Sequence, residues 1–200
     1  DAVYDGLYET DLSLIEPMAA LPHSPGNVDT VKSLKGMKVN QVLIGSCTNS
    51  SYADMVKVGN ILDGKHIAKD VSLGIAPGSR EVMMMILSDG TLSKMVKAGA
   101  RILESACGFC IGAHQSPSSE GVSLRTNNRN FEGRSGTKSA KVYLVSPETA
   151  ALSALYGFVA DPMEECDTSK VENVVINEFI SDDSMFVFPK ENTESVEIIR

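Results

Sequence analysis

The feature that most constrains the fold is an alternation of β-branched runs and helical patterns between residues 38 and 157. The first run, residues 39–44, predicts a strand that ends at Gly45-Ser46 and leads into a helix. The same order recurs, with further strands predicted at 71–76, 100–104, 122–125 and 141–145 and helices at 80–87, 91–97 and after Ser146. Such alternation predicts a layered α/β/α domain with a largely parallel sheet.

Local signals set the ends of the expected helices. Ser51 followed by Asp54 forms a capping-box pattern, and Ser146-Pro147 with Gly157 brackets an Ala- and Leu-rich helix. Four methionines, whose sulfur atoms are soft metal ligands in other settings, recur at helical spacing among aliphatic residues and are interpreted as core (Met83, Met84, Met85 and Met95).

The chain divides into three segments by composition. Residues 1–37 are expected to form an extended arm or inter-domain segment, because Pro17, Pro22 and Pro25 exclude a long helix. Residues 38–162 form the predicted α/β domain. Residues 163–200 are acidic and weakly patterned, and are interpreted as an extension leading to a mobile domain beyond this chain.

The charge balance restricts the classes of partner. A formal net charge of -8 argues against nucleic acid or an anionic membrane surface as a general partner. No run reaches transmembrane length, and the first residues have neither a basic region nor an apolar signal core. We therefore expect a cytoplasmic protein.

Three cysteines follow predicted strand ends. Cys47 lies in the turn after the first strand, and Cys107 and Cys110 form a C-x-x-C after residues 100–104. Ligands collect at the carboxyl edge of such sheets, so the three thiols are expected to share one site. Three thiolates can hold a 4Fe-4S cluster with one iron left open, and an open iron acts as a Lewis acid toward a substrate hydroxyl or carboxylate.

Other interpretations of these residues stay open. The C-x-x-C alone is also typical of a redox dithiol or an incidental turn. Cys47, Cys107 and Cys110 with His114 match a Cys3His zinc set. Cys166 is interpreted as a bystander because acidic neighbours oppose ligation, and His23 and His66 are interpreted as surface residues.

One stretch departs from the acidic balance. Residues 125–141 hold five basic residues against the single acid Glu132, a local charge of +4 (Arg125, Arg129, Arg134, Lys138 and Lys141). The planar guanidinium suits bidentate capture of carboxylates, and Gly133 and Gly136 allow a close backbone approach. The alternative is a solvated basic loop.

Four motifs in this order carry a family resemblance. They are Ile44 to Tyr52 (IGSCTNSSY), Ala106 to Gly112 (ACGFCIG), Asn128 to Arg134 (NRNFEGR) and Ser146 to Ala150 (SPETA). The set resembles the aconitase and isopropylmalate dehydratase large-subunit superfamily over residues 39–162. The resemblance implies that Cys47, Cys107 and Cys110 ligate a 4Fe-4S cluster, that Asn128 lies against it, and that Arg129 and Arg134 bind substrate carboxylates.

The resemblance also implies an activity. The chain is similar to the third, iron-sulfur domain of an aconitate hydratase, a hydro-lyase of the tricarboxylic acid cycle that isomerises citrate and isocitrate through cis-aconitate. CGFCIG is closer to aconitases and FEGR to the dehydratases, so 3-isopropylmalate or homoaconitate dehydration is the alternative. The catalytic base is expected in another domain of the enzyme, and this chain alone is expected to be inactive. The alternative of another class is a non-catalytic structural or regulatory metal-binding module.

Overall fold

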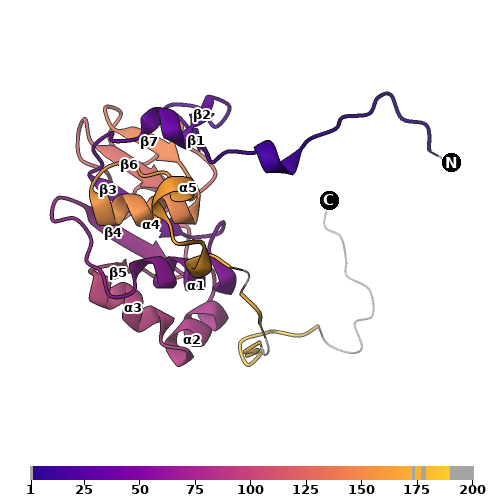
Figure 1. Cartoon of the computed structure of the whole chain (residues 1–200). Helices are drawn as coiled ribbons and strands as arrows, with labels where there is room; N and C mark the ends of the chain where they lie inside the picture. The colour runs from indigo at the N-terminus through magenta and orange to yellow at the C-terminus, as the bar shows by residue number, and fades with distance from the viewer. Residues whose placement is uncertain (1, 173, 177–178, 190–200) are drawn as a thin grey trace, which may run out of the picture.

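A seven-stranded sheet forms the centre of the computed structural model, which describes residues 2–172, 174–176 and 179–189 (Figure 1). The strands are β1 (Met18–Ala20), β2 (Val28–Thr30), β3 (Gln41–Gly45), β4 (Ser72–Ala76), β5 (Arg101–Ile102), β6 (Val122–Arg125) and β7 (Lys141–Leu144). Their order across the sheet is β2-β1-β7-β6-β3-β4-β5. The run from β7 to β5 is parallel, which confirms the predicted largely parallel sheet.

Helices follow strands β3, β4 and β7, as the sequence predicted. They are α1 (Tyr52–Leu62), α2 (Arg80–Ser88), α3 (Thr91–Ala98), α4 (Pro147–Tyr156) and the short α5 (Pro162–Glu165), with 3-10 turns η1 (Leu12–Leu14), η2 (Val31–Leu34), η3 (Phe109–Ile111) and η4 (Thr168–Lys170). The capping box at the start of α1 is present, because the side chains of Ser51 and Asp54 each bind the other's backbone N-H. Ser146 caps α4, and Gly157 ends it in the left-handed conformation.

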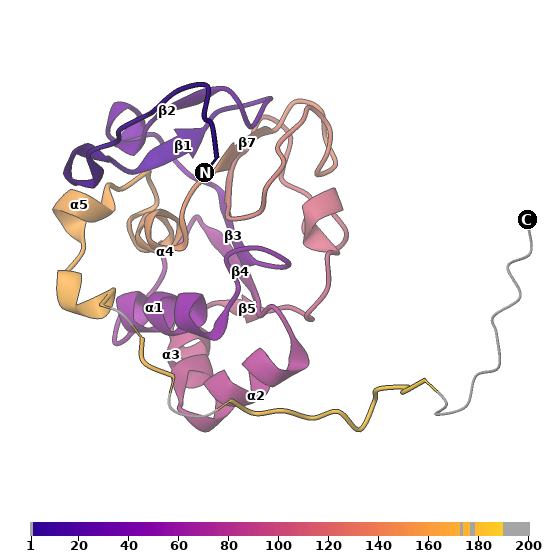
Figure 2. The same ribbon diagram turned by 90° about the vertical axis from the view of Figure 1, so that its right-hand side faces the viewer.

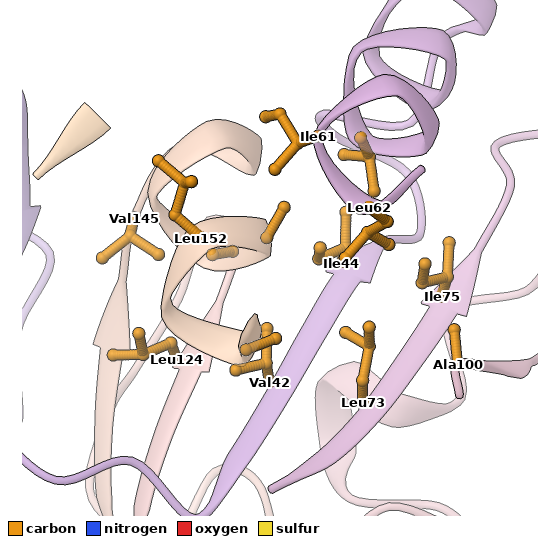
Figure 3. Close-up of a cluster of buried hydrophobic side chains, with 14 of the residues drawn as sticks. Val42, Ile44, Ile61, Leu62, Leu73, Ile75, Ala100, Leu124, Val145 and Leu152 are labelled. Carbon is orange, nitrogen blue, oxygen red and sulfur yellow. The ribbon is translucent and has the colours of Figure 1, made fainter. Parts of the chain in front are cut away.

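The two faces of the sheet are covered differently. Helices α1, α3 and α4 lie on one side of it (Figure 2). Val42, Ile44 and Leu124 point toward α1 and α4 and form the main core with residues of both helices (Figure 3). On the opposite face, Leu43 packs with Ala76, Phe109 and Cys110. The loop that carries the C-x-x-C therefore lies directly on the sheet.

The N-terminal segment differs in part from the expected arm. Its second half forms the hairpin β1–β2, and β1 pairs antiparallel with β7 through Ala20 and Leu144. The pairing is non-local, so the short runs around Pro17, Pro22 and Pro25 gave no local sign of it. The domain limits at residues 38 and 162 stay a prediction, although the sheet itself already includes Met18.

The remaining expectations on packing and segments are mostly met. Met85 and Met95 are buried, as the core interpretation requires, whereas Met84 faces solvent on the outer side of α2. No helix of the described ranges is both long enough and apolar enough to cross a bilayer. The predicted extension from residue 163 includes most of α5 and η4, and its end, residues 190–200, lies outside the described residues.

Candidate functional site

Two of the predicted motifs meet at the carboxyl edge of the sheet. Cys47 follows β3 by two residues, and the C-x-x-C begins five residues after β5. Ser46 joins them, because its hydroxyl lies 3.4 Å from the sulfur of Cys110 and donates to the carbonyl of Ala106 at 3.3 Å. Residues sixty positions apart in the chain therefore share one site.

The segment after β6 is tied to the same place. Thr126 accepts a hydrogen bond from the backbone N-H of Gly45 through its hydroxyl, at 2.8 Å. Its carbonyl accepts from the side chain of Asn49 at 2.5 Å and from the hydroxyl of Thr48 at 3.4 Å. The turn of Cys47 is thus held against the strand that leads into the arginine stretch.

The backbone of the Cys47 turn is strained. Ser46 has φ 84° and Asn49 has φ 52°, both in the left-handed region that non-glycine residues seldom occupy. Such strain persists only where surrounding contacts over-determine the conformation, and it concentrates at functional sites. Here the contacts with Ala106, Cys110 and Thr126 supply that support.

The thiols influence one another. Burial opposes ionisation of Cys110, but hydrogen bonds from Ser46, Asn127 and Cys107 and the charge of Arg125 outweigh it and lower the pKa of that thiol. The pKa of Cys107 is raised, first by its hydrogen bond to Cys110 and then by the negative charge there, and the charge of Cys47 acts in the same direction. The pKa values of Cys107 and Cys110 are therefore shifted in opposite directions.

The arginine stretch turns back toward the sheet after β6. Asn128 and Arg129 are exposed, while Arg134 is partly buried. Between the two arginines, Asn130 is fully buried, and its side-chain amide donates to the carbonyls of Leu21 and Val142 at 2.8 and 3.1 Å. Asn130 therefore holds the loop against β1 and β7, with Arg129 left facing outward.

Unsatisfied polar atoms gather in this region. Four buried side-chain nitrogen or oxygen atoms of the described residues lack a hydrogen-bond partner: Gln115 Nε2, Asn127 Oδ1, Asn130 Oδ1 and Arg134 Nε. All four belong to the segments that follow the C-x-x-C and β6. Buried polar groups without partners are uncommon in native proteins, and their concentration here favours a site that binds a polar ligand.

The burial of Arg125 was not predicted from the sequence. It was placed at the end of the predicted strand 122–125 and counted with the basic stretch 125–141, and it is fully buried at the end of β6. It shares a face of the sheet with Ser123, two residues earlier, and binds that residue's hydroxyl. The strand period was the available signal, because a strand continuing through Arg125 turns its side chain inward. Ser46 and Asn127, which contact Cys110, were not singled out either.

The alternative ligands do not join the cysteines. His23, His66 and His114 are exposed, and Cys166 lies partly buried near α4, where burial raises the pKa of its thiol. Within the described ranges, no three His, Cys, Asp or Glu side chains are grouped closely enough to hold a single metal ion.

The donor set fits a 4Fe-4S cluster on these observations. Three cysteines come from two loops at one sheet edge, and Ser46 and Asn127 offer hydrogen bonds to sulfur. The buried cation Arg125 lies close enough for its charge to act on Cys110. Hydrogen bonds and charge around the thiolates are the means by which proteins tune such clusters.

Comparison with known proteins gives consistent matches. Residues 1–157 match the family model described as "Aconitase family (aconitate hydratase)". The chain is 40% identical over 165 residues to the methanogen homoaconitase large subunit of Methanocaldococcus jannaschii, covering 82% of this chain and 39% of that protein. It is 44% identical over 163 residues to 3-isopropylmalate dehydratase large subunit 1 of Methanopyrus kandleri, covering 81% and 39%.

A third relative, the 3-isopropylmalate dehydratase large subunit of Elusimicrobium minutum, is 42% identical over 164 residues, covering 82% of this chain and 39% of that protein. The chain thus spans about two fifths of the length of these curated relatives.

Proposed function

Because this chain belongs to the aconitase family, we propose that it is the iron-sulfur part of a hydro-lyase acting on a small hydroxy acid with two or three carboxylates. The observation that carries the proposal is the contact of Ser46, the residue before Cys47, with the loop of Cys107 and Cys110, beside an arginine stretch. The family match covers the same residues, 1–157.

In this proposal Cys47, Cys107 and Cys110 hold a 4Fe-4S cluster, and Asn128 lies beside it. When bound, the cluster supplies an open iron that acts as a Lewis acid toward a substrate hydroxyl. The chain's own residues prepare the site: hydrogen bonding with Ser46 and Asn127 lowers the pKa of the Cys110 thiol. Thr126 holds the Cys47 turn in register with them.

Arg129 and Arg134 would bind the substrate's carboxylates. Arg129 is exposed on the loop, and the unpaired Nε of Arg134 leaves one donor free for an acceptor. Fixing two carboxylates orients the carbon that carries the hydroxyl and offsets the substrate's charge. No base for proton abstraction is assigned on this chain, and we place it elsewhere in the whole enzyme.

The relatives favour 3-isopropylmalate dehydration or the homoaconitase reaction over aconitate hydration. The three relatives compared carry the names of 3-isopropylmalate dehydratase or homoaconitase large subunits. We therefore propose the substrate class that sequence analysis gave as the alternative, and the expected place in the tricarboxylic acid cycle loses its support. The FEGR motif, which is closer to the dehydratases, agrees with this choice.

The same names bear on partners. A large subunit implies a smaller one, so we propose a separate small subunit as a partner, in addition to the rest of the enzyme. The relatives are more than twice as long as the part matched here, which leaves room for the missing catalytic groups. A cytoplasmic location stays a proposal.

Cluster uptake tests the site. Iron and acid-labile sulfide are measured per chain after anaerobic reconstitution of the wild type, Cys47→Ser and the control Cys166→Ser. We expect about four of each in the wild type and the control, and a clear loss in Cys47→Ser, because a cluster with three cysteine ligands then keeps only two.

Two results would contradict the site. If Cys47→Ser takes up as much iron as the wild type, the C-x-x-C acts without Cys47. If only zinc is retained, the chain is a structural metal module of the non-catalytic class. Loss of the folded state on chelation would favour the same structural role.

Substrate choice needs the whole enzyme with its small subunit, assayed with 3-isopropylmalate, homoaconitate and cis-aconitate. We expect one of the first two to give the highest kcat/KM. Arg134→Lys should lower that kcat/KM by about 10- to 100-fold, because lysine loses the bidentate fork. The control Arg80→Lys, at an exposed arginine of α2, should leave it unchanged.

A further inference from the structure

The buried side chain of Arg125 lies at the centre of a polar network beneath the cysteine loop. Its Nη1 donates to the carbonyl of Phe109 at 2.6 Å, and its Nη2 donates to the carbonyl of Gln115 at 3.0 Å. These two carbonyls lie on either side of Cys110 in the chain. One guanidinium therefore holds both ends of the segment that follows Cys107.

The network is anchored in the parallel sheet. Arg125 Nε donates to Ser123 Oγ at 3.1 Å, and Nη2 donates to Gln41 Oε1 at 3.1 Å. Ser123 donates in turn to Gln41 at 2.8 Å, and these two residues are paired across β6 and β3. The sheet holds the guanidinium of Arg125, and the guanidinium donates to the loop. The loop therefore takes its position from strands β3 and β6.

The charge of Arg125 has no carboxylate to balance it. No ion pair involving Arg125 occurs among the described residues, although its side chain is fully buried. A buried cation without an opposite charge is costly. Cys110 is the one titratable side chain whose charge acts noticeably on the guanidinium. We therefore expect the negative charge that balances Arg125 to lie at the thiols.

We propose that Arg125 is a positioning residue for the cluster site, which fixes the Cys107–Cys110 loop and balances the negative charge of the thiolate-bound cluster from beneath. This inference rests on the proposed function, and it adds a role that is separable from ligation. The fork of the guanidinium fixes the position of the loop, and its charge balances the charge of the cluster. Different variants can remove these two contributions separately.

Three variants of the chain separate these parts. Arg125→Lys keeps the charge and loses the fork, and Arg125→Gln loses the charge. Gln41→Glu keeps the hydrogen-bond acceptor for Arg125 but places a carboxylate beside it, which cancels the local charge while the arginine stays. If the arginine variants fail to fold, Gln41→Glu still tests the role of the charge. Urea unfolding of each cluster-free chain shows which variants fold.

Three measurements follow reconstitution: amide hydrogen exchange of residues 106–115, the rate of iron loss to a chelator, and the midpoint reduction potential of the cluster. We expect each variant to lose iron about 10- to 100-fold faster than the wild type, as for other residues that support metal ligands. Amide hydrogen exchange of residues 106–115 should be faster in Arg125→Lys, because lysine lacks the fork that holds this loop. The potential should fall in Arg125→Gln and Gln41→Glu, because a balancing positive charge favours the reduced, more negative cluster, and should stay near wild type in Arg125→Lys.

The outcomes distinguish this inference from the function it rests on. If the wild type takes up a cluster while every variant that folds keeps wild-type iron loss and potential, Arg125 has only a structural role and the inference alone is overturned. If exchange and stability change but the potential does not, the charge-balancing role is overturned. A wild type that takes up no cluster overturns the proposed function and this inference together.

Discussion

Asn130 shows how one side chain fixes the arginine loop. Its amide nitrogen lies 2.8 Å from the carbonyl of Leu21 and 3.1 Å from that of Val142, in a position without solvent access. It lies between Arg129 and Arg134 in the chain and connects both to the N-terminal hairpin. The hairpin therefore supports the loop that we propose binds carboxylates, although the hairpin is distant in sequence.

Replacing Asn130 tests that support. Asn130→Ala removes the buried hydrogen bonds to the carbonyls of Leu21 and Val142, so the free energy of unfolding should fall by about 2 kcal/mol. Asn128→Ala, at an exposed neighbour, should change it by less than about 0.5 kcal/mol. Urea unfolding measures both. Equal stabilities of the two variants would show that the buried amide does not hold the loop.

At the scale of single residues, the sequence indicated the residue types of the candidate site. It indicated less well where their side chains lie. The cysteines could be grouped because each follows a strand end, and parallel strands share that edge. Counting charges did not separate Arg125 from Arg129 and Arg134, because the burial of Arg125 follows from its place at the end of β6 and not from its charge. Asn130 and Ser46 act through contacts with distant segments, which local patterns do not carry.

The end of β3 is the element on which the Cys47 turn depends. Gly45 pairs with Ala76 of β4, has φ 100°, and is followed by Ser46, whose backbone N-H donates to the carbonyl of Ala76 at 2.9 Å. A Cβ added at Gly45 would collide with that same carbonyl group. Only glycine allows β3 to stay paired while the chain turns sharply toward Cys47.

Gly45→Ala should disrupt that strand end. Strain and collision together should lower the free energy of unfolding by at least about 3 kcal/mol. Gly64→Ala is the matched control, because Gly64 also has positive φ, at 69°, but its added Cβ meets nothing within 4 Å. That control should cost only about 1 kcal/mol. Urea unfolding measures the stability of both variants. A Gly45→Ala variant as stable as Gly64→Ala would show that a Cβ at residue 45 does not collide with the carbonyl of Ala76.

Elements with local signals were predicted closely, and elements formed by distant pairing were not. The capping box fixed the start of α1, and Ser146 and Gly157 fixed both ends of α4. In contrast, β5 is limited to Arg101–Ile102, because only Gly74 and Ile75 of β4 pair with it. The hairpin β1–β2 carries no strong alternation, since it is an edge addition with mostly exposed side chains in β2.

At the scale of the whole molecule, the proposed cluster site would join segments that the fold otherwise connects mainly through the sheet. Cys47 follows β3, in the middle of the sheet, and the C-x-x-C follows β5 at its edge, with β4 between them. Ser46 links the two loops through Ala106 and Cys110, and Thr126 ties the Cys47 turn to the end of β6. A cluster ligated by all three cysteines would add a cross-link at the carboxyl edge, on the face opposite α1 and α4.

Cluster loading should therefore raise the stability of the whole chain. A group bound only by the folded state, at about a thousand times its dissociation constant, adds about 4 kcal/mol. For a chain of this size that corresponds to a rise in Tm of roughly 8–16 °C. Calorimetry under anaerobic conditions, with and without reconstitution, measures the rise, and Cys166→Ser should show it in full.

Cys47→Ser separates this cross-link from a local effect of the C-x-x-C. If the sheet-wide link is the source of the stability, the reconstituted variant should melt at the temperature of the cluster-free chain, because the contribution of β3 to the site is lost. The two cluster-free forms should melt close together, since Cys47 is exposed. A reconstituted Cys47→Ser that melts as high as the reconstituted wild type would mean that the metal stabilises only the loop of residues 107–110, and that β3 takes no part in holding it.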